Sequence, residues 1–378
     1  MPDKPSLLFM SHLHPPLDNP LESIGGMQEV SQQLLHHLKK TGTFEVHEWV
    51  NHSSWKHIEW STAGYLAKSL REVPLLIKQH NIQLIVYGSM VTAALSPVLR
   101  AMGVSVPMIA INHGQDVTLP ITPYQWWVPR VFRALTRVIS VSEATSQQSI
   151  DRGLDSSKAK ILPNGVKLDF ARTMPAQQVA KETLATTQDI DASKPMLLTV
   201  GRLVERKGHA WFLQDVLPYV KTPVQYLIIG EGPQQESIEQ ISGFIHNETS
   251  HRVIVMGRQE EDVVHHAYAA ADAFIMPNIR VEGDMEGFGI VLLEANAVGC
   301  PAIATYIEGI RDVIQEGVNG YAIQEGDAAT FAQSIDQLLS DSTTQEILRK
   351  SSKKRAETFE WQVLVKEYEA IFGSTLKK

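Results

Sequence analysis

Two glutamates, Glu286 and Glu294, bracket a Gly-Phe-Gly turn and the start of an apolar segment in this chain. The glycines leave backbone N–H groups bare where a helix is predicted to begin, and the helix dipole favours anions there. An unpaired Glu294 carboxylate in that segment would be costly, whereas two ribose hydroxyls would satisfy it. Glu286 lies just before the turn, where it can reach whatever the phosphate carries. The pattern predicts a sugar-nucleotide site, although an amphipathic helix with a surface Glu at each end would share it.

Two cations, Arg202 and Lys207, follow an apolar run at residues 196–200 and precede a predicted helix. This position puts them at the carboxyl edge of a parallel sheet, where α/β proteins bind their ligands. Negative charge grows on a pyrophosphate as its bond to a sugar breaks, and two fixed cations would stabilise that charge. We predict that both cations face the phosphates, and the alternative is a solvated basic turn.

Glycine turns follow several of the apolar runs. Gly25 and Gly26 open a helix, and paired glycines let a backbone N–H approach a phosphate closely. The turn is not a dinucleotide fingerprint, because G-x-G-x-x-G is absent. Gly230 and Gly257 end two further runs, and the Arg258 guanidinium could stack on a base. These glycines could instead simply close βα turns.

His113 and Asp116 follow the apolar run at residues 108–112. Side chains at the carboxyl end of a strand can point into a ligand crevice. We expect both to bond sugar hydroxyls or to help position an acceptor, with Asp116 on the acceptor side. A structural histidine is the alternative.

No metal site is predicted. The 14 histidines show no H-x-x-x-H spacing, Cys300 is the only cysteine, and the D-x-D triplet at residues 189–191 lies in an irregular stretch. A single cysteine excludes an intrachain disulfide, which fits a reducing compartment.

A segment at residues 124–137 mixes aromatic side chains with spaced arginines. Arg130, Arg133 and Arg137 are predicted to share one helical face, which could lie on an anionic membrane or grip a lipid phosphate. An amphipathic helix that covers the sheet would show the same pattern.

The elements that must position these residues follow an α/β pattern, in which short apolar runs alternate with helical periodicity. The predicted buried strands are residues 7–10, 84–87, 108–112, 138–141, 196–200, 226–229, 253–256, 273–276 and 302–305. We expect two doubly wound, Rossmann-like domains that face a cleft.

The expected domains are residues 1–170, on the acceptor side, and 195–359, which binds the nucleotide sugar. Residues 171–194 are expected to form a linker. The amphipathic segment at residues 360–378 is expected to pack back onto the first domain.

Length and charge agree with this organisation. A chain of 378 residues is too long for one ordinary core. Its net charge of −8 argues against nucleic acid as the main partner. The N-terminal apolar run is too short for a signal peptide, and no run approaches the roughly 20 residues of a membrane span. We expect a cytoplasmic protein, at most peripheral to a membrane.

In combination these motifs resemble the retaining glycosyltransferases of family four, of the bacterial envelope, exopolysaccharide or glycolipid type, which have the GT-B fold of two Rossmann domains. The resemblance covers nearly the whole chain. It rests on the E-x7-E element, the G-R-x-x-x-x-K turn, the paired glycines, V-S-E at residues 141–143 and L-P-N-G-V at residues 162–166.

The resemblance implies a role for each matching position. Arg202 and Lys207 would hold the donor pyrophosphate, Glu286 would contact the sugar hydroxyls, and Glu294 would bind the ribose. The remaining implied contacts are backbone amides of Phe288, Gly289 and Ile290 to sugar and phosphate, Gly26 to the distal phosphate, and His113 near the sugar.

The reaction expected on this basis is metal-independent and needs no cofactor, because the nucleotide sugar is a substrate. A hexose would pass, with retention, to a hydroxyl of a saccharide or lipid-linked acceptor. UDP-glucose or a related UDP-sugar is the first expected donor, and GDP-mannose is the second. The alternatives are a sugar-nucleotide epimerase or phosphorylase on the same fold, or a non-catalytic nucleotide-sugar-binding protein.

Overall fold

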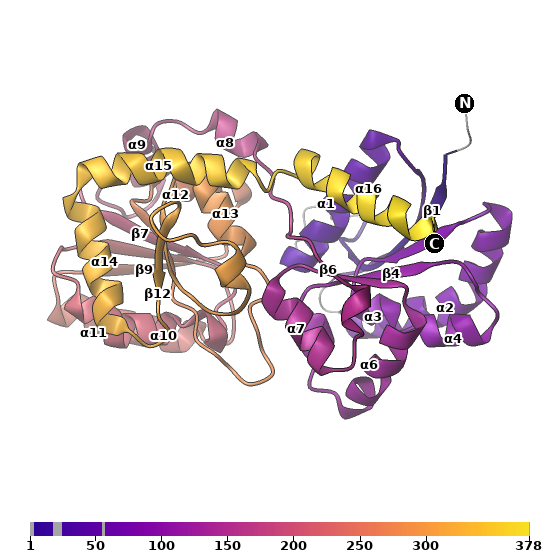
Figure 1. Ribbon diagram of the computed structural model, residues 1–378. Helices are drawn as coiled ribbons and strands as arrows, with labels where there is room; N and C mark the ends of the chain where they lie inside the picture. Colours follow the sequence, from indigo (N-terminus) through magenta and orange to yellow (C-terminus); the bar gives the residue numbers. More distant parts are fainter. Residues whose placement is uncertain (1–3, 18–24, 55–56, 378) are drawn as a thin grey trace. The chain divides into compact units, whose positions relative to one another are not determined.

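The computed structural model describes residues 4–17, 25–54 and 57–377. The chain divides into two compact units, which are described separately (Figure 1). Unit 1 comprises Met1–Gly165 and Trp361–Lys378, and unit 2 comprises Val166–Glu360. The start of the predicted glycine turn, Ser23 and Ile24, lies outside the described residues.

Unit 1 is built on a parallel six-stranded sheet with the strand order β2-β1-β3-β4-β5-β6. Its strands are β1 (Ser6–His14), β2 (Glu45–His52), β3 (Leu84–Tyr87), β4 (Met108–Asn112), β5 (Arg137–Ser140) and β6 (Ala159–Ile161). Its helices are α1 (Gly26–Thr41), α2 (Ile58–Gln79), α3 (Met90–Ala93), α4 (Ser96–Ala101), α5 (Gln115–Thr118), α6 (Thr122–Ala134), α7 (Glu143–Asp151), the 3₁₀ turn η2 (Ser156–Lys158) and α16 (Trp361–Leu376).

Helices cover both faces of this sheet (Figure 1). On one face, apolar residues of α2, α4 and α6 pack with strand residues into a single buried cluster that includes Val73, Leu99 and Phe132. On the other face, α16 lies against α1, where the His37 and Trp361 rings stack with their centroids 6.0 Å apart. A Cβ atom at Gly165 would come within 2.3 Å of Trp361, so only glycine fits beside that ring. The C-terminal helix therefore belongs to the core of unit 1.

Unit 2 repeats the plan with a parallel sheet of order β12-β11-β10-β7-β8-β9. Its strands are β7 (Met196–Val200), β8 (Gln225–Ile229), β9 (Arg252–Gly257), β10 (Ala273–Met276), β11 (Ala302–Thr305) and β12 (Gly320–Ile323). Its α-helices are α8 (Asp169–Thr173), α9 (Gln177–Thr187), α10 (His209–Trp211), α11 (Gln235–Glu248), α12 (Glu261–Ala270), α13 (Ile290–Ala297), α14 (Ala328–Ser340) and α15 (Ser342–Glu357). Short 3₁₀ or π turns are η3 (Glu205–Lys207), η4 (Phe212–Val216), η5 (Leu217–Tyr219) and η6 (Glu308–Asp312).

The predicted α/β class is confirmed, and all nine predicted strands are present within about one residue of their expected positions, apart from β1, which is longer. The strands that the sequence pattern did not predict are β2, β6 and β12, and each lies at an edge of its sheet. An edge strand is only partly covered, so it does not need the continuous apolar run of a buried parallel strand, although β9, also at an edge, has one. The sequence of β2, which alternates charged, histidine and apolar residues, shows this directly.

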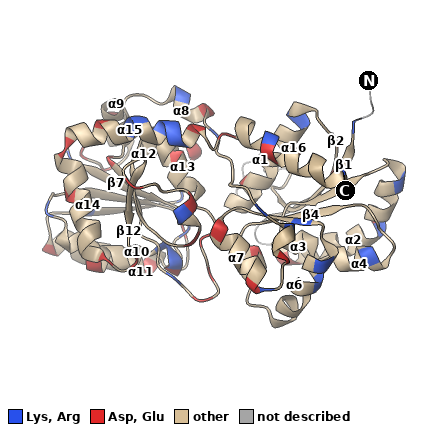
Figure 2. Ribbon diagram, viewed as in Figure 1, with Lys and Arg blue, Asp and Glu red and all other residues tan. Residues whose placement is uncertain are grey.

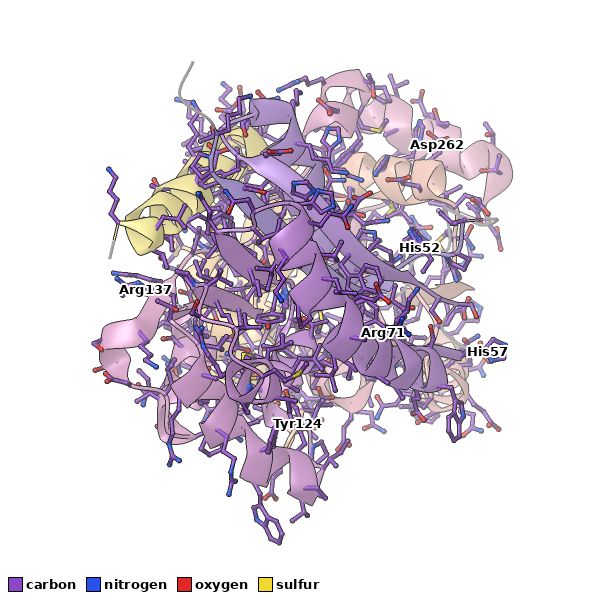
Figure 3. The ribbon with its side chains drawn as sticks, turned by 90° about the vertical axis from the view of Figure 1, so that its right-hand side faces the viewer. His52, His57, Arg71, Tyr124, Arg137 and Asp262 are labelled. Atoms are coloured by element: carbon purple, nitrogen blue, oxygen red, sulfur yellow. The ribbon has the colours of Figure 1, made fainter. Side chains whose placement is uncertain are left out.

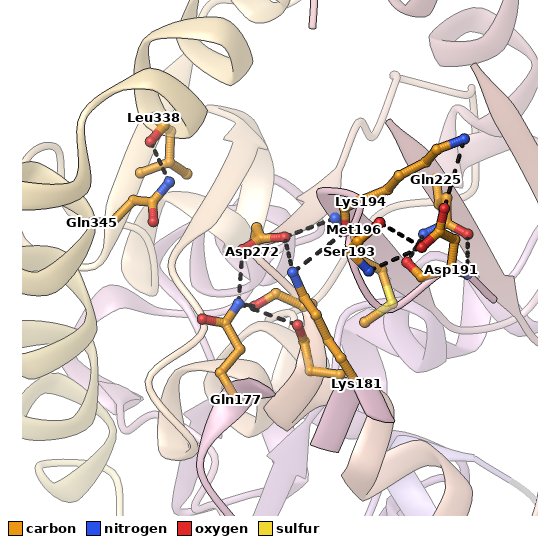
Figure 4. Close-up of polar contacts among 12 residues, drawn as sticks. Gln177, Lys181, Asp191, Ser193, Lys194, Met196, Gln225, Asp272, Leu338 and Gln345 are labelled. Carbon is orange, nitrogen blue, oxygen red and sulfur yellow. Dashed lines mark hydrogen bonds and ion pairs between the residues drawn. The ribbon is translucent and has the colours of Figure 1, made fainter. Parts of the chain in front are cut away.

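The predicted linker at residues 171–194 differs from the structure. It contains the end of α8 and all of α9, and α9 packs in unit 2 through buried Ala180 and Leu184. Figure 4 shows that Lys181 forms an ion pair of 2.8 Å with Asp272, which also accepts hydrogen bonds from the Met196 N–H and Gln177. The segment looks irregular in sequence because its apolar face is narrow and some of its contacts are made with polar partners far away in the chain.

Charge is divided unevenly between the units. Unit 1 carries 17 Lys and Arg against 14 Asp and Glu, whereas unit 2 holds the remaining 17 basic and 28 acidic residues of the totals of 34 and 42. In the described ranges, no helix combines the length and the apolar character that a membrane span requires.

Candidate functional site

The centre of the site in unit 2 is an ion pair between Lys207 and Glu286. Lys207 Nζ lies 2.5 Å from Glu286 Oε2, and the Asn278 side-chain amide donates to the same oxygen at 2.9 Å. All three residues are buried. The structure thus brings together two predicted site residues that are 79 positions apart in the sequence.

Local backbone requirements set the position of Lys207. After β7, the chain forms the short turn η3 and ends it at Gly208, whose φ of 67° is left-handed. A Cβ atom there would lie 1.9 Å from the Pro277 carbonyl oxygen, so only glycine allows the two loops to touch. This contact places Lys207 beside the residues that lead to Glu286.

The electrostatics of the pair favour a charged Glu286. Burial alone would raise the pKa of the Glu286 carboxyl, but the Lys207 and Arg206 cations and the hydrogen bonds from Lys207 and Asn278 lower it to about 2. Burial lowers the pKa of Lys207, and the charge of Glu286 opposes that shift. The pair is therefore a buried arrangement of opposite charges in fixed positions. Such an arrangement can stabilise a charge that develops nearby without rearranging.

Arg206 belongs to this site, although the sequence analysis did not select it. Its Nε atom lies 3.2 Å from Asp284 Oδ1, and its buried Nη1 atom has no hydrogen-bond partner among the residues that the structure describes. The ion pair holds the segment before Glu286 against η3. Only the neighbouring position of Arg206, next to Lys207 in the basic turn, hinted at this role.

Glu294 lies on α13, and Gly289, the residue just before this helix, has a left-handed φ of 88°. The hydroxyl of Tyr268 donates a hydrogen bond of 2.8 Å to Glu294 Oε2. Burial, together with the charge of Glu294, raises the pKa of Tyr268 well above its usual value, so the phenol remains a proton donor. Tyr268 orients the carboxylate, and no motif in the sequence links the two residues.

Arg202 and Arg258 follow β7 and β9, the two strands that flank β8, and both residues are exposed. Backbone hydrogen bonds connect these strand ends, from Gly201 to Ile229 and from Gly230 to Gly257. Both guanidinium groups therefore originate at the carboxyl edge of the unit 2 sheet.

In unit 1, His113 and Asp116 lie together after β4, but Asp116 is not available to a ligand. Its two carboxylate oxygens accept hydrogen bonds from the backbone N–H groups of Met90, at 2.8 Å, and of His113, at 2.9 Å. Burial raises the pKa of Asp116, whereas His113 and these hydrogen bonds lower it. The geometry replaces the expected acceptor contact with a structural one, because Asp116 joins the starts of α3 and α5.

His113 itself remains partly exposed, and its Nε2 atom bonds the Gly88 carbonyl oxygen at 2.9 Å. A second histidine, His12 at the end of β1, lies near it and bonds Ser89 through Nδ1 at 3.2 Å. Burial and the neighbouring His113 lower the pKa of His12 to about 4. Gly26, the first residue of α1, follows Gly25, whose φ is 136°.

The prediction that three arginines share one helical face at residues 124–137 is wrong for Arg137. The helix α6 ends at Ala134, so Arg137 is the first residue of β5 and donates to the Ser157 carbonyl oxygen at 2.9 Å. Figure 3 shows Arg137 well apart from Tyr124 of α6. The extended conformation of Leu135, which is buried in the core, ends the helix before the third arginine. Arg130 and Arg133 remain exposed on α6, next to Trp126 with 72 % of its surface exposed.

Within residues 4–17, 25–54 and 57–377, no three His, Cys, Asp or Glu side chains are grouped as a metal ion would require.

Comparisons with known proteins agree with this architecture. Residues 194–341 match the family described as Glycosyl transferases group 1, and residues 24–170 match Glycosyltransferase Family 4. The chain is 30% identical over 274 residues to the GDP-mannose-dependent alpha-(1-6)-phosphatidylinositol monomannoside mannosyltransferase of Mycobacterium tuberculosis, which covers 70% of this chain and 69% of that protein. It is 26% identical over 289 residues to the sulfoquinovosyl transferase SQD2 of Arabidopsis thaliana, where the match spans 73% of this chain but only 52% of the relative.

Solved structures share the fold. HepE of Anabaena, in complex with UDP, has a TM-score of 0.74 at 16% identity, over 98% of this chain and 100% of that one. The sucrose-phosphate synthase of Thermosynechococcus elongatus has a TM-score of 0.77 at 18% identity, over 98% of both chains. These structures have the GT-B fold of the glycosyltransferases. The two family matches and the mannosyltransferase relative show that this chain belongs to the family 4 glycosyltransferases.

Proposed function

We propose that this protein is a retaining, metal-independent glycosyltransferase that moves a hexose from a nucleotide diphospho-sugar to a hydroxyl of a saccharide or lipid-linked acceptor. The observation that carries the proposal is the buried Lys207–Glu286 pair, at 2.5 Å, next to a glycine-started helix that bears Glu294. The arrangement offers a cation for phosphate, a carboxylate for sugar hydroxyls and a second carboxylate for ribose.

In the proposed donor complex, Glu294 accepts hydrogen bonds from the ribose hydroxyls while Tyr268 fixes its orientation. The backbone amides of residues 288–290 meet the sugar and the phosphate at the start of α13. Lys207 donates one hydrogen bond to Glu286 and has two further N–H groups for the pyrophosphate. Arg202 approaches the pyrophosphate from the end of β7, and Arg258 stacks on the base.

The proposed reaction is a front-face substitution. The acceptor oxygen attacks the anomeric carbon on the face from which the pyrophosphate departs, and the carbon–oxygen bond to phosphate breaks. The bonding electron pair passes to the phosphate oxygen, which also receives the acceptor proton. Lys207 and Arg202 stabilise the charge that grows on the leaving group, and Glu286 holds the sugar hydroxyls, so the enzyme contributes position and charge.

A UDP-sugar such as UDP-glucose is the first proposed donor, and GDP-mannose is the second. The mycobacterial relative is named as GDP-mannose-dependent, and the HepE structure contains UDP. A thermal-shift screen against UDP-, GDP- and ADP-sugars separates these possibilities. The true donor, at 100 times its Kd, should stabilise the protein by about 2.7 kcal/mol.

Three measurements test the whole proposal. The purified protein with the best-stabilising donor should transfer the hexose to a panel of saccharide and lipid-linked acceptors. Proton NMR of the product should show the anomeric configuration of the donor. Activity should survive exhaustive EDTA treatment, because Arg202 and Lys207 supply the positive charge. Binding of no nucleotide sugar, an inverted product, or activity that returns only with added magnesium or manganese would each contradict one part.

We also propose a peripheral contact with anionic lipid through Arg130 and Arg133, the two basic residues of α6, whose ribbon is partly blue in Figure 2. The exposed Trp126 beside them would enter the headgroup region.

A further inference from the structure

Glu308, at the start of η6, has a backbone conformation that is rare for its residue type. Its φ is 45°, in the left-handed region where a Cβ atom crowds the following carbonyl. Among the residues that the structure describes, Asn81 is the other non-glycine residue there, with φ 49°. Asparagine tolerates this region better than glutamate, and glycine adopts it without steric cost. A glutamate at such a position points to a side-chain contact that outweighs the strain.

That contact is made with the main chain of Glu286. Glu308 Oε2 accepts a hydrogen bond of 2.6 Å from the Glu286 N–H. The next residue, Gly309, donates its N–H to the Glu286 carbonyl oxygen at 3.0 Å. The peptide groups on both sides of the Glu286 Cα are therefore held by two successive residues of one turn.

The same turn lies directly against the backbone that follows Glu286. A Cβ atom at Gly309 would come within 2.0 Å of the Gly287 oxygen and 2.7 Å of the Phe288 nitrogen. Only glycine permits this approach. Residues 308 and 309 thus support the main chain from Glu286 to Phe288, immediately before α13.

The surroundings of Glu308 disfavour its negative charge. Burial raises the pKa of Glu308, the hydrogen bond from the Glu286 amide lowers it, and the like charge of Glu286 raises it again. Arg280 and Arg206 lower it, and the net pKa of Glu308 is raised. Since strain and like charge both oppose a glutamate at this position, the amide hydrogen bond is the interaction that its side chain provides.

We propose that Glu308 is a positioning residue for Glu286. Its carboxylate fixes the Glu286 main chain, so that the Glu286 side chain, already bound to Lys207 and Asn278, has a single orientation toward the donor sugar. The inference rests on the proposed role of Glu286 in sugar binding. Loss of the Glu308 carboxylate should lower turnover but leave the affinity for the nucleotide unchanged, because Glu308 has no part in the proposed contact between Glu294 and the ribose.

The test compares Glu308→Gly, Glu308→Ala and Glu308→Gln with the control Asn81→Gly. Glu308→Gly removes the carboxylate and relieves the strain, so we expect its Tm to equal or exceed that of the wild type. Its kcat should fall about 10- to 100-fold, as for other small displacements of reacting groups. The Kd for the free nucleoside diphosphate should change less than about twofold. Asn81→Gly relieves similar strain in unit 1, and its kcat should not change.

A direct readout of the contact does not depend on activity. Hydrogen exchange of a peptide that covers residues 285–289 should become faster in Glu308→Gly and Glu308→Ala. Glu308→Gln should restore both the protection and most of kcat, because its side-chain carbonyl accepts the same hydrogen bond.

Unchanged exchange in Glu308→Gly would overturn the contact. Faster exchange with wild-type kcat would overturn the positioning role, as would a Glu308→Gln variant no better than Glu308→Gly. Glu286→Ala is measured alongside. If Glu286→Ala retains full turnover, the proposed function of Glu286 fails and the positioning role fails with it. If it loses turnover while Glu308→Gly does not, only the positioning role fails.

Discussion

At the scale of single residues, the buried Lys207–Glu286 pair ties stability to the protonation of one carboxyl. Both side chains are buried, and removal of one partner from such a pair leaves an uncompensated charge. The site therefore depends on the two residues together, and the proposed chemistry uses a contact that also stabilises unit 2.

The first prediction follows from the depressed pKa of Glu286. A carboxyl whose pKa falls from 4.5 unfolded to about 2 folded stabilises the folded state above pH 4.5. This contribution, about 3 kcal/mol at neutral pH, is lost as the pH falls from 4.5 toward 2. Urea unfolding between pH 6 and 3 should show the loss in the wild type, and Glu286→Gln should show a weaker pH dependence. Parallel curves for the two proteins would remove Glu286 from this linkage.

The second prediction concerns nucleotide binding. Glu294→Ala should weaken the affinity for the free nucleoside diphosphate by about 1.5–3 kcal/mol, because the ribose loses a charged partner. Tyr268→Phe should have a smaller effect, about 0.5–1.5 kcal/mol, because it removes only the hydrogen bond that orients Glu294. Isothermal calorimetry measures both variants. Unchanged affinity in Glu294→Ala would exclude this residue from the ribose site.

The residues that the sequence pattern could not predict share one property. Four residues act through another residue: Asn278, Tyr268, Arg206 and Glu308. Their partners lie 8, 26, 78 and 22 positions away, respectively. Glu286, Glu294 and Lys207 could be selected because each belongs to a local motif with a helix start or a strand end. Residues that orient others carry no such local pattern, so only the fold reveals them.

At the scale of elements, how completely a strand or helix is buried determines whether its sequence pattern reveals it. Central strands such as β3 and β10 are completely buried and read as continuous apolar runs, whereas the edge strands β2, β6 and β12 do not. The sequence does not predict α9 for a related reason, because its buried apolar face is short and a buried ion pair of Lys181 with Asp272 adds to its attachment to unit 2. The spacing of the arginines predicts a helix that reaches Arg137, but α6 ends at Ala134, where Leu135 becomes extended and enters the core.

The third prediction tests how α9 is attached. Asp272→Ala should lower the free energy of unfolding of unit 2 by about 3–5 kcal/mol, because it leaves the buried Lys181 ammonium without an acidic partner and the Met196 N–H without the Asp272 acceptor. Asp191→Ala, also drawn in Figure 4, is the control, because its ion pair with Lys194, at 3.9 Å, and its hydrogen bonds from Ser193 are all exposed. Urea unfolding should show almost no change for the control. Equal effects of the two variants would mean that α9 adds little to unit 2.

At the scale of the whole molecule, the net charge conceals a difference between the units. Unit 1 has three more basic than acidic residues, although the chain as a whole has a net charge of −8. If unit 2 binds the donor and unit 1 the acceptor, as proposed, the slightly basic unit 1 would allow contact with an anionic surface although unit 2 is acidic. Local patches determine such contacts more than the overall charge does.

The last prediction is therefore made for α6. Arg130 and Arg133 are exposed on this helix, and each basic residue near an anionic lipid surface contributes about 1 kcal/mol, which salt screens. The wild type should co-sediment at low salt with vesicles that contain an anionic lipid but not with neutral ones. Arg130→Gln/Arg133→Gln should reduce binding about 30-fold, which corresponds to about 2 kcal/mol.

The control for that experiment is Arg71→Gln/Lys78→Gln, which removes the same charge from exposed positions of α2 and should bind as the wild type does. Figure 3 labels Arg71 on that helix. Equal losses in the two double variants would show that binding follows the net charge of unit 1 rather than the α6 surface. If the wild type binds neither kind of vesicle, α6 is only a helix that covers the sheet, and a water-soluble acceptor becomes the better proposal.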